Sequence, residues 1–380
     1  MYSLRVYGAM IADARRFNAY AKAIARAVRP GDTVADIGCG PGVFSLLACR
    51  AGARRVFAIE PADSIQFARE LAAANGFTDR IEFAQSDSRK TELPERVNVI
   101  VSDLRGVLPL FGHAIPSLED ARQRLLATGG IMIPQRDTLK AAVIEAREYY
   151  SLLMYPWRKS VPRLDLSPLV LPILNQSYGS SFKKNQLLTE TQDFGLLDYT
   201  QGAATSVTAE LDFRAAREGT AHGVCLWFET KLFENIGYSS GPAHADSVHG
   251  QLFLPWLEPV TLKVGQGIHI ELHADLVDRD YIWRWETRIP AGRKHQALRF
   301  QQSTFQGANL SLQSLRRQAV DYAPLLSEAG KADLWMVQKM DGSTSLQEIA
   351  RSASERFPHL FSSWREALVR AVELFKEFSS

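Results

Sequence analysis

The sequence has few of the features that would fix its compartment. Only three cysteines occur among 380 residues, and none forms a Cys-x-x-Cys pair. This argues against a disulfide framework and a cysteine-based metal site, and it is typical of a reducing, cytoplasmic setting. No apolar run approaches the ~20 residues of a membrane-spanning helix. The N-terminal apolar patch is followed at once by Asp13, Arg15 and Arg16, so we expect neither a membrane span nor a signal peptide.

Strong net charge is also missing. The 44 basic and 42 acidic residues leave a formal charge of +2, which is too small to predict nucleic acid as a general partner. Hydrophobic residues make up 46% of the chain, as in an ordinary globular protein. Because 380 residues exceed the usual size of a single hydrophobic core, we expect two or three domains.

Strands and helices alternate along the N-terminal part of the chain. Apolar residues recur at helical spacing from Asp13 to Val28, and later helices are expected at 43–51, up to 75–76, and around 118–126. The short apolar strands between them are residues 34–37, 56–59, 97–101 and 131–133. This alternation predicts an α/β fold, with a Rossmann-like, doubly wound parallel sheet over residues 1–134.

A period of two replaces the helical pattern after Pro134. Apolar and polar residues alternate along 224–229, 268–276 and 281–289. We therefore expect an antiparallel β-barrel or sandwich domain over residues 135–295, in which 151–186 look irregular.

Beyond Arg293 the chain is expected to be helical. Ser345 with Glu348 and Ser363 with Glu366 are capping boxes, which predict two helix starts. Residues 300–380 are therefore interpreted as a small helical, winged-helix-like module.

The sharpest chemical signal is Val-Ala-Asp-Ile-Gly-Cys-Gly-Pro-Gly at residues 34–42, where a strand enters a glycine turn and then a helix. Gly38, Gly40 and Gly42 allow the backbone to approach a ligand closely. Glu60 ends the next strand, where a carboxylate can accept both hydroxyls of a ribose. This combination predicts a nucleoside cofactor, and the alternative is a glycine turn with a purely structural role.

The identity of the nucleoside is indicated by a glycine that the dinucleotide-binding motif contains and this sequence lacks. Val43 occupies the last slot of Gly-x-Gly-x-x-Gly, which makes NAD the weaker interpretation. Asp36, immediately before the turn, suits the amino-acid end of S-adenosylmethionine.

Several segments together resemble the protein arginine methyltransferases. They are Met10–Arg16, Tyr20, Asp36–Gly42, Ser45–Ala53, Ala58–Pro61, Leu93-Pro94, Trp227–Glu229, Gly237–Pro242 and Gln251, and they span roughly residues 2–290. The resemblance implies a doubly wound sheet followed by a β barrel, S-adenosylmethionine as cofactor, and the homodimer of that family. Residues 151–190 do not visibly preserve the family's dimerisation arm, so the oligomeric state is left open.

The resemblance also implies roles for single residues. Arg16 falls on the arginine that pairs with the methionine carboxylate, a contact that suits the guanidinium fork. Asp36 and Gly38 fall on the methionine pocket, and Glu60 falls on the ribose acid. Asp87-Ser88 lie where methyltransferases usually meet the adenine ring.

Two signatures of the family are altered. Arginine methyltransferases hold the guanidinium between two glutamates, but here Asp103 replaces the first and Gly112 the second, and Arg105 adds a positive charge nearby. We expect Asp103 to serve as a weak base that receives the proton. Its alternative role is that of a turn residue.

The family's Thr-His-Trp triplet reads Ser247-Val248-His249. Val248 cannot supply the imidazole, and in an extended segment the shifted His249 would point to the opposite side. His249 and His113 are candidate general bases for a neutral acceptor, with packing as the alternative.

Residues Leu334 to Phe378 are similar to PqqD-like peptide-binding modules, and a generic helical cap is the equal alternative. The leading hypothesis is therefore an S-adenosylmethionine-dependent methyltransferase with a peptide or small-molecule acceptor. The alternative is a cofactor-binding pseudoenzyme or peptide-binding scaffold.

Overall fold

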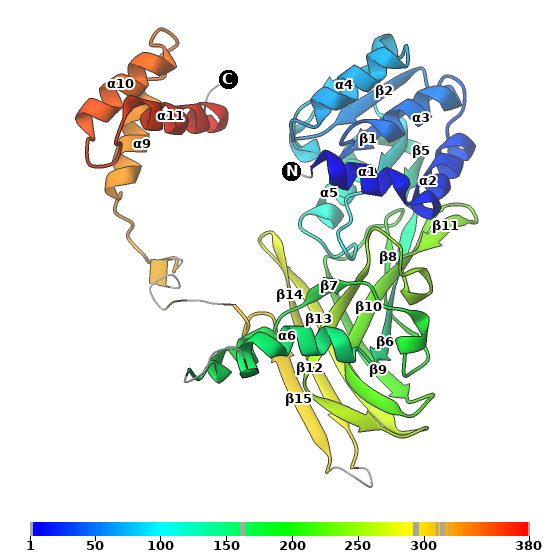
Figure 1. The fold of residues 1–380 in the computed structure, drawn as a ribbon. Helices are drawn as coiled ribbons and strands as arrows, with labels where there is room; N and C mark the ends of the chain where they lie inside the picture. Colours follow the sequence, from blue (N-terminus) through cyan, green and yellow to red (C-terminus); the bar gives the residue numbers. More distant parts are fainter. Residues whose placement is uncertain are drawn as a thin grey trace. The chain divides into compact units, whose positions relative to one another are not determined.

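The computed structural model describes residues 3–159, 164–291, 296–308, 311, 316–317 and 319–378. The chain forms two compact units, Met1–Ala308 and Asn309–Ser380, and each is described by itself. In Figure 1 the first unit runs from blue to yellow and the second from orange to red. Within the described ranges, no helix combines the length and the apolar character needed to cross a membrane.

A five-stranded parallel sheet forms the first half of the larger unit, in the order β3-β2-β1-β4-β5. The strands are β1 (Thr33–Ile37), β2 (Arg55–Ile59), β3 (Ile81–Ala84), β4 (Val97–Ser102) and β5 (Leu126–Ile133). The strand order reverses between β1 and β4, which makes the carboxyl ends of these strands the topological switch point of the sheet. The predicted doubly wound sheet is confirmed.

Helices flank this sheet (Figure 1). They are α1 (Leu4–Ala12), α2 (Ala14–Ala27), α3 (Val43–Ala51), α4 (Ile65–Ala74) and α5 (Ala114–Asp120), with 3-10 turns at Thr78–Arg80 and Ser88–Lys90 and a π-helical turn at Ala121–Leu125. Asp13 caps α2, because its carboxylate accepts a hydrogen bond from the Arg16 backbone nitrogen at 3.1 Å. This cap fixes the start of the helix that carries Arg16 and Tyr20.

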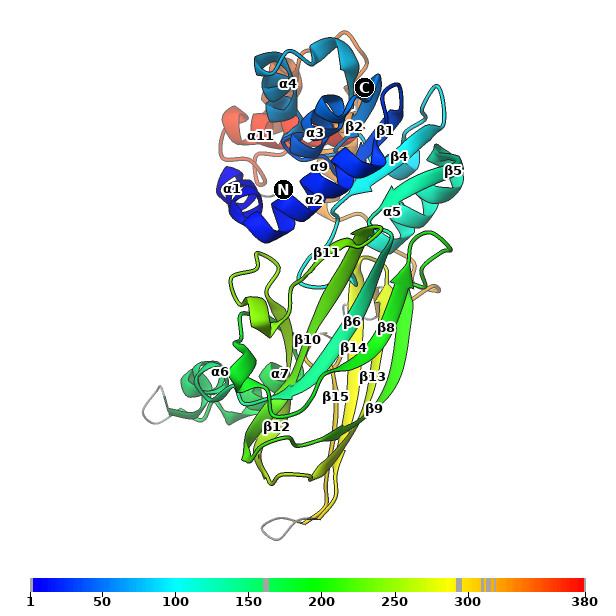
Figure 2. The ribbon, with the colours of Figure 1, turned by 90° about the vertical axis from the view of Figure 1, so that its right-hand side faces the viewer.

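Two antiparallel sheets form the second half of the unit (Figure 2). One has the order β7-β12-β10-β6-β8 with β11 paired to β10, and the other has the order β15-β14-β13-β9. Their strands are β6 (Arg136–Ile144), β7 (Tyr178–Ser180), β8 (Gln192–Asp198), β9 (Ser206–Arg214), β10 (Gly219–Phe233), β11 (Ile236–Ser239), β12 (Gln251–Leu262), β13 (Gly267–Val277), β14 (Asp280–Ile289) and β15 (Leu298–Ser303). The alternating apolar residues of β13 and β14 face the core, which confirms the predicted antiparallel domain.

The prediction of an irregular segment at 151–186 is wrong. It contains most of α6 (Arg147–Lys159), a 3-10 turn at Ser167–Leu169, α7 (Val170–Leu174), strand β7 and a further 3-10 turn at Lys184–Gln186. Helix α6 buries Tyr150 and Met154, which are one turn apart. Pro156 lies inside α6, and a proline interrupts the helical signal of a sequence even where the helix continues.

The expectation of helix directly beyond Arg293 is also wrong. Strand β15 pairs with β14, and the Trp285 indole nitrogen donates to Gln302 Oε1 at 3.1 Å. Phe300 and Gln302 point inward among polar neighbours, so the strand carries too few apolar residues to show a clear period of two.

The smaller unit contains three helices in its described part, α9 (Glu328–Gln338), α10 (Leu346–Arg356) and α11 (Trp364–Phe378). Its core consists of Met336, Ile349, Ala350, Ala353, Ala367, Ala371 and Leu374. The capping box of Ser345 and Glu348 is present as predicted. At α11 the Ser363 hydroxyl accepts from the Glu366 nitrogen at 3.4 Å as predicted, but the Glu366 carboxylate accepts from the Ser362 nitrogen at 2.7 Å, one residue before the predicted partner.

Candidate active site

A cavity of about 490 Å³ lies at the carboxyl ends of β1, β2 and β4, which is the switch point of the parallel sheet. We call it the donor cavity. Its lining includes Arg16, Gly38, Gly40, Glu60, Asp103 and Arg105. A second cavity of about 280 Å³ is lined by Asp87 and Ser88 and shares Gly38, Pro61, Leu104 and Phe111 with the first.

The glycine turn has a backbone that other residues rarely adopt. Gly38, Gly40 and Gly42 have φ angles of 71°, 52° and 80°. A Cβ atom on Gly38 would lie 2.4 Å from a methyl of Leu104, and one on Gly40 would lie 2.7 Å from the Tyr7 ring. The positive φ angles favour glycine at all three positions, and at Gly40 the Tyr7 ring also leaves little room for a side chain.

Glu60 is held rigidly beside this turn. Its Oε2 accepts from the Gly40 nitrogen at 3.0 Å, and its Oε1 accepts from the Ala62 nitrogen at 2.9 Å. Each carboxylate oxygen retains a further lone pair, so the group can accept from two hydroxyls of a bound molecule.

Asp36 is the second-last residue of β1 and lines neither of the two cavities. It is buried, and its Oδ2 accepts a hydrogen bond from the Ser45 hydroxyl at 2.6 Å. Burial raises the pKa of Asp36 to about 7, although the bond from Ser45 opposes that shift. This carboxyl group therefore changes charge near neutral pH.

Asp87 and Ser88 line the second cavity, and each is hydrogen-bonded to an arginine of the protein. Arg89 grips the Asp87 carboxylate at both oxygens, at 3.1 and 2.7 Å, and this hydrogen bonding lowers the pKa of Asp87 to about 2. Ser88 is buried, and its carbonyl oxygen accepts from Arg124 at 2.6 Å.

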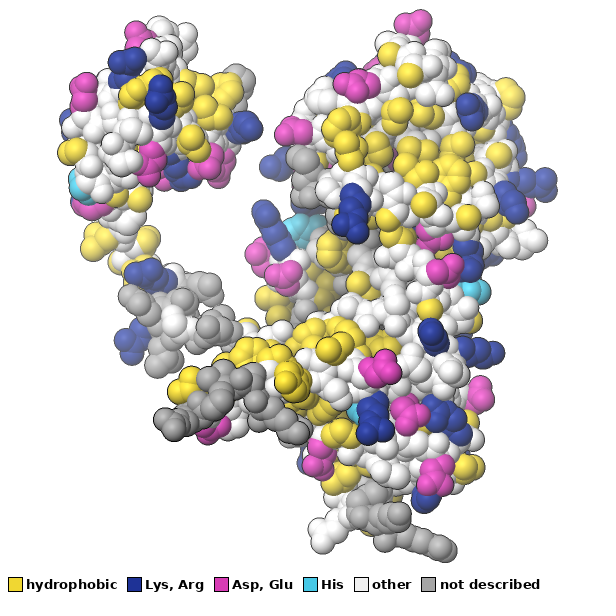
Figure 3. All heavy atoms as spheres, viewed as in Figure 1, with side chains coloured by type: hydrophobic (Ala, Val, Ile, Leu, Met, Phe, Trp, Pro, Cys, Tyr) yellow, Lys and Arg dark blue, Asp and Glu magenta, His cyan; other side chains and the backbone are white. Residues whose placement is uncertain are grey.

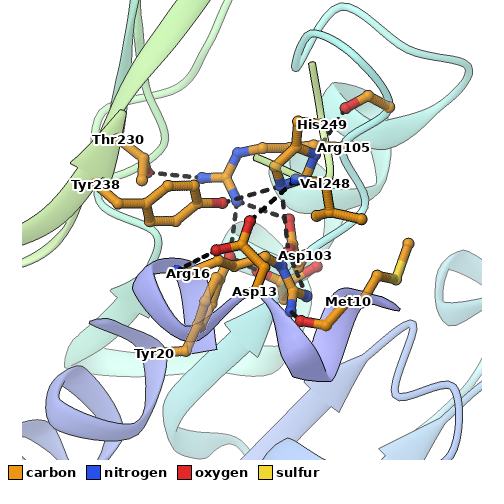
Figure 4. Close-up of polar contacts among 12 residues, drawn as sticks. Met10, Asp13, Arg16, Tyr20, Asp103, Arg105, Thr230, Tyr238, Val248 and His249 are labelled. Carbon is orange, nitrogen blue, oxygen red and sulfur yellow. Dashed lines mark hydrogen bonds and ion pairs between the residues drawn. The ribbon is translucent and has the colours of Figure 1, made fainter. Parts of the chain in front are cut away.

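Arg16 pairs with Asp103 at the wall of the donor cavity (Figure 4). Its Nε donates to Asp103 Oδ2 at 2.7 Å, its Nη2 lies 2.6 Å from the same oxygen, and its Nη1 donates to the Met10 carbonyl at 2.9 Å. Arg16, which the sequence assigned to the cofactor, and Asp103, which it assigned to catalysis, are therefore in direct contact.

Arg105 occupies the opposite side of Asp103 and is almost fully buried. Its Nη1 donates to Asp103 Oδ1 at 2.9 Å and to the Tyr20 hydroxyl at 2.7 Å. Its Nε and Nη2 donate to the two oxygens of Asp137, each at 2.9 Å, and Nη2 also reaches the Thr230 hydroxyl at 2.8 Å. These five bonds match the five N–H groups of a guanidinium.

The partners of Arg105 were missed by sequence reasoning. Asp137 and Thr230 lie on β6 and β10, 32 and 125 residues away from Arg105. The Tyr199 hydroxyl also donates to Asp137, at 2.7 Å. Neither Asp137 nor Thr230 lies in a strand that the sequence predicted, and a lone polar residue does not indicate a partner.

The Asp103 carboxylate thus lies between two guanidinium groups. Burial alone would raise its pKa, but Arg16 and Arg105 together hold the pKa of Asp103 well below its ordinary range. Asp103 stays ionised at any physiological pH, which makes it a weak proton acceptor.

The expectation that His249 points away from the site is wrong. Its Nε2 lies 3.2 Å from the Tyr238 hydroxyl and 3.9 Å from Asp103 Oδ2. The segment is a turn, closed by a bond from the Gly250 nitrogen to the Ser247 carbonyl at 3.1 Å, so the strand alternation rule does not apply.

The hydrogen bonds of His249 also fix its tautomer. Nδ1 lies 2.9 Å from the Gly106 carbonyl, which can only accept, so Nδ1 carries the proton and Nε2 a lone pair. Burial lowers the pKa of His249, which keeps the ring neutral. His113 is elsewhere: its Nε2 contacts the Asp278 carbonyl at 2.8 Å, and it lines the second cavity.

The fold and the site define the class of the larger unit. It combines an antiparallel domain with an α/β domain whose cavity lies at the switch point of the parallel sheet, where such sheets bind their ligands. In agreement, residues 20–153 match the family model described as ribosomal protein L11 methyltransferase (PrmA).

Within this class, the chain is similar to protein arginine N-methyltransferases. It is 30% identical to probable protein arginine N-methyltransferase 6 of Arabidopsis thaliana over 63% of this chain and 56% of the relative. It is 34% identical to probable protein arginine N-methyltransferase 6.1 of Oryza sativa subsp. indica over 60% of this chain and 62% of the relative. The chain thus spans about three fifths of the length of these curated relatives.

Solved structures show the same fold. The Trypanosoma brucei PRMT1 enzyme–prozyme heterotetrameric complex with AdoHcy superimposes with a TM-score of 0.73 at 21% identity, covering 78% of this chain and 97% of that one. Protein arginine methyltransferase 10 of Arabidopsis thaliana gives a TM-score of 0.69 at 19% identity, covering 80% and 98%.

Proposed function

We propose that the protein transfers the methyl group of S-adenosylmethionine to a peptide or small-molecule acceptor. The observation that carries this proposal is the Glu60 carboxylate, fixed by two backbone N–H groups beside a turn whose three glycines have positive φ. Such a carboxylate suits the two hydroxyls of a ribose. The likeness to arginine methyltransferases, one of them with bound AdoHcy, supports the same cofactor.

The proposed roles are those that the resemblance implies: Asp36 pairs with the cofactor ammonium, Arg16 with its carboxylate, and Asp87-Ser88 with its adenine ring. Gly38, Gly40 and Gly42 let the backbone approach the methionine end. In support, Arg16, Gly38 and Gly40 line the donor cavity, and Asp87 and Ser88 line the second cavity. Transfer then proceeds by in-line displacement at the methyl carbon, with alignment and exclusion of water supplying most of the acceleration.

Asp103 and His249 remain the candidate catalytic residues. Asp103 lines the donor cavity and is positioned to orient an acceptor. The ring of His249 is neutral, and its Nε2, which carries a lone pair, lies 3.9 Å from Asp103 Oδ2. The low pKa of Asp103 makes release of the proton to solvent after transfer the favoured route.

Replacing Glu60 by glutamine should weaken binding of S-adenosylhomocysteine about 10- to 100-fold, which is the scale of hydrogen bonds to a charged group, about 1.5–3 kcal/mol. Isothermal titration calorimetry measures this directly. Glu70→Gln on the exposed face of α4 is the matched control and should bind like the wild type. Equal affinity in all three proteins would refute the cofactor site.

Cofactor affinity should also depend on pH through Asp36. Below pH 7 the free protein holds a proton on this carboxyl, and binding of the ammonium group must release that proton. Affinity is therefore expected to fall by up to about tenfold per pH unit as the pH drops below 7, and to level off above it. Calorimetry from pH 5.5 to 7.5 tests this, and a slope that Asp36→Asn leaves unchanged would assign it to another group.

A second candidate function is a cofactor-binding pseudoenzyme or scaffold. It is favoured by one observation, which is that Arg16 and Arg105 already occupy both oxygens of Asp103. Release of S-adenosylhomocysteine during incubation with candidate acceptors separates the two functions, because a scaffold binds the cofactor without consuming it.

We also propose a division of labour along the chain: residues 1–134 bind the cofactor, 135–295 contact the acceptor, and 300–380 recruit a peptide in the manner of PqqD-like modules. The smaller unit has a core of its own, which supports a separable role. Deleting residues 309–380 should leave cofactor affinity unchanged by calorimetry. A large loss, with residues 1–308 still folded by circular dichroism, would contradict this division.

We propose that the protein is a homodimer and that it works in a reducing, cytoplasmic compartment. All three cysteines are buried and unpaired. Exposed hydrophobic side chains gather along α6, where Leu152 and Tyr155 are 71% and 64% exposed (Figure 3). Apolar side chains exposed together on one helix are typical of an interaction surface. Analytical ultracentrifugation of the wild type and of a Leu152→Glu/Tyr155→Glu variant tests whether α6 mediates self-association.

A further inference from the structure

The guanidinium of Arg105 occupies a cation-binding site at the wall of the donor cavity. This site, which we call the seat, is formed by Asp103, Asp137 and Phe228. Asp103 reaches it from the end of β4, and Asp137 grips it at both oxygens from β6. The Phe228 ring lies over it, with 5.3 Å between the guanidinium carbon and the ring centroid. Two carboxylates and an aromatic face are the groups that recognise a planar cation in proteins.

We propose that Arg105 determines acceptor specificity by occupying this seat itself. A cationic group brought by an acceptor finds its place taken, so the protein selects acceptors that are uncharged at the site of methylation. The inference rests on the proposed function and names the substrate class of the same site.

The charges that line the donor cavity support this selection. Among the described lining residues, the acidic groups are Glu60 and Asp103. Glu60 is committed to the Gly40 and Ala62 nitrogens and to the proposed ribose contact. Both oxygens of Asp103 are bound by Arg16 and Arg105.

A further cation would therefore lie beside two guanidinium groups and the cofactor's sulfonium, without a carboxylate of its own. Such an arrangement is unfavourable, because charges of like sign repel each other more strongly beside a protein wall than in bulk water. An uncharged nitrogen or oxygen does not meet this repulsion, and it also keeps the lone pair that attacks the methyl carbon.

Emptying the seat tests the proposal. Arg105→Ala removes the internal cation, and methylguanidinium chloride is the probe that replaces it. We expect the thermal midpoint of the S-adenosylhomocysteine complex to rise saturably at millimolar methylguanidinium in this variant and to stay constant in the wild type, against sodium chloride at equal ionic strength. Arg122→Ala, which empties a surface pair with Glu119, is the matched control and should not respond.

A readout of acceptor specificity separates this role from a purely structural one. With S-adenosylmethionine and methylguanidinium, Arg105→Ala should release S-adenosylhomocysteine at least tenfold faster than the wild type. In that reaction the methyl–sulfur bond breaks, a carbon–nitrogen bond forms, and the guanidinium proton passes to solvent. Stabilisation without this gain would show that Arg105 only holds the fold, and would overturn the proposal.

Two further measurements keep the outcomes distinct. If Arg105→Ala does not fold, Arg105→Gln removes the charge while keeping amide donors toward Asp137, and the same gain of cation-dependent release is expected. Its absence in a folded Gln variant equally overturns the proposal. Calorimetry of the wild type with S-adenosylhomocysteine is a separate test. Failure to bind would refute the proposed function, whereas the role of Arg105 is decided by the response to methylguanidinium.

Discussion

Replacing Asp137 by alanine should lower the free energy of unfolding of the larger unit by about 3–5 kcal/mol. The variant leaves the guanidinium of Arg105 buried without its bidentate partner, and it also removes the acceptor of the Tyr199 hydroxyl. An uncompensated buried charge is among the most destabilising defects known in folded proteins. Urea unfolding followed by tryptophan fluorescence measures the loss, and urea is used because the ions of guanidinium chloride would screen the unpaired charge.

The double variant Arg105→Met/Asp137→Leu should recover most of that stability, because removing both charges together leaves neither one unpaired. Glu119→Ala breaks the surface pair with Arg122 and should cost less than about 1 kcal/mol, as solvent-exposed pairs do. If Asp137→Ala were as mild as Glu119→Ala, water would have to reach Arg105, and the seat would not be the closed site described above.

The cofactor side of the site could be predicted because its parts are contiguous in the sequence. A strand, a glycine turn and a helix follow one another within residues 33–51, and steric rules favour glycine where φ is positive. Glu60 needed only the assumption that the next strand ends at the same edge of the sheet. Nothing in this inference depended on distant residues.

The acceptor side could not be predicted in the same way. Arg105 was interpreted as a charge that opposes a substrate, because Asp103, its one acidic neighbour in the sequence, was assigned to the acceptor. Its other partners, Asp137 and Thr230, come from β6 and β10. These two strands pair at nine positions, from Gly223 opposite Ile144 to Lys231 opposite Arg136. Which side chains of a sheet meet a distant loop is decided by tertiary packing rather than by local pattern.

His249 illustrates how a correct rule fails on a wrong premise. Alternation holds for extended strands, but residues 242–250 form a 3-10 turn followed by tight turns, with Gly250 at a φ of 63°. The Val248 nitrogen also donates to the Asp13 carboxylate at 3.0 Å, which fixes this segment against the start of α2. The segment is therefore positioned by contacts that are 235 residues apart in sequence.

The wild-type protein is expected to methylate glycine- and arginine-rich peptides no faster than the background without acceptor. A peptide guanidinium would need two free carboxylates, whereas Asp103 is bound on both oxygens and the second acidic position of the resembled family holds Gly112. Incubation with labelled S-adenosylmethionine, followed by mass spectrometry for methylarginine, measures this. Matched peptides in which glutamine replaces each arginine set the background.

Restoring one glutamate should not create arginine methylation. Gly112 has a φ of 46°, a conformation that costs a side-chain-bearing residue about 1–2 kcal/mol, although no neighbouring atom lies closer than 3.8 Å to an added Cβ. Gly112→Glu also leaves Arg105 in its seat, so a substrate guanidinium still meets a positive charge. Activity on arginine peptides is expected only in variants that carry Arg105→Ala, with or without Gly112→Glu, because only these empty the seat. Robust turnover by the wild type would show instead that Arg105 moves out of its seat when an acceptor binds.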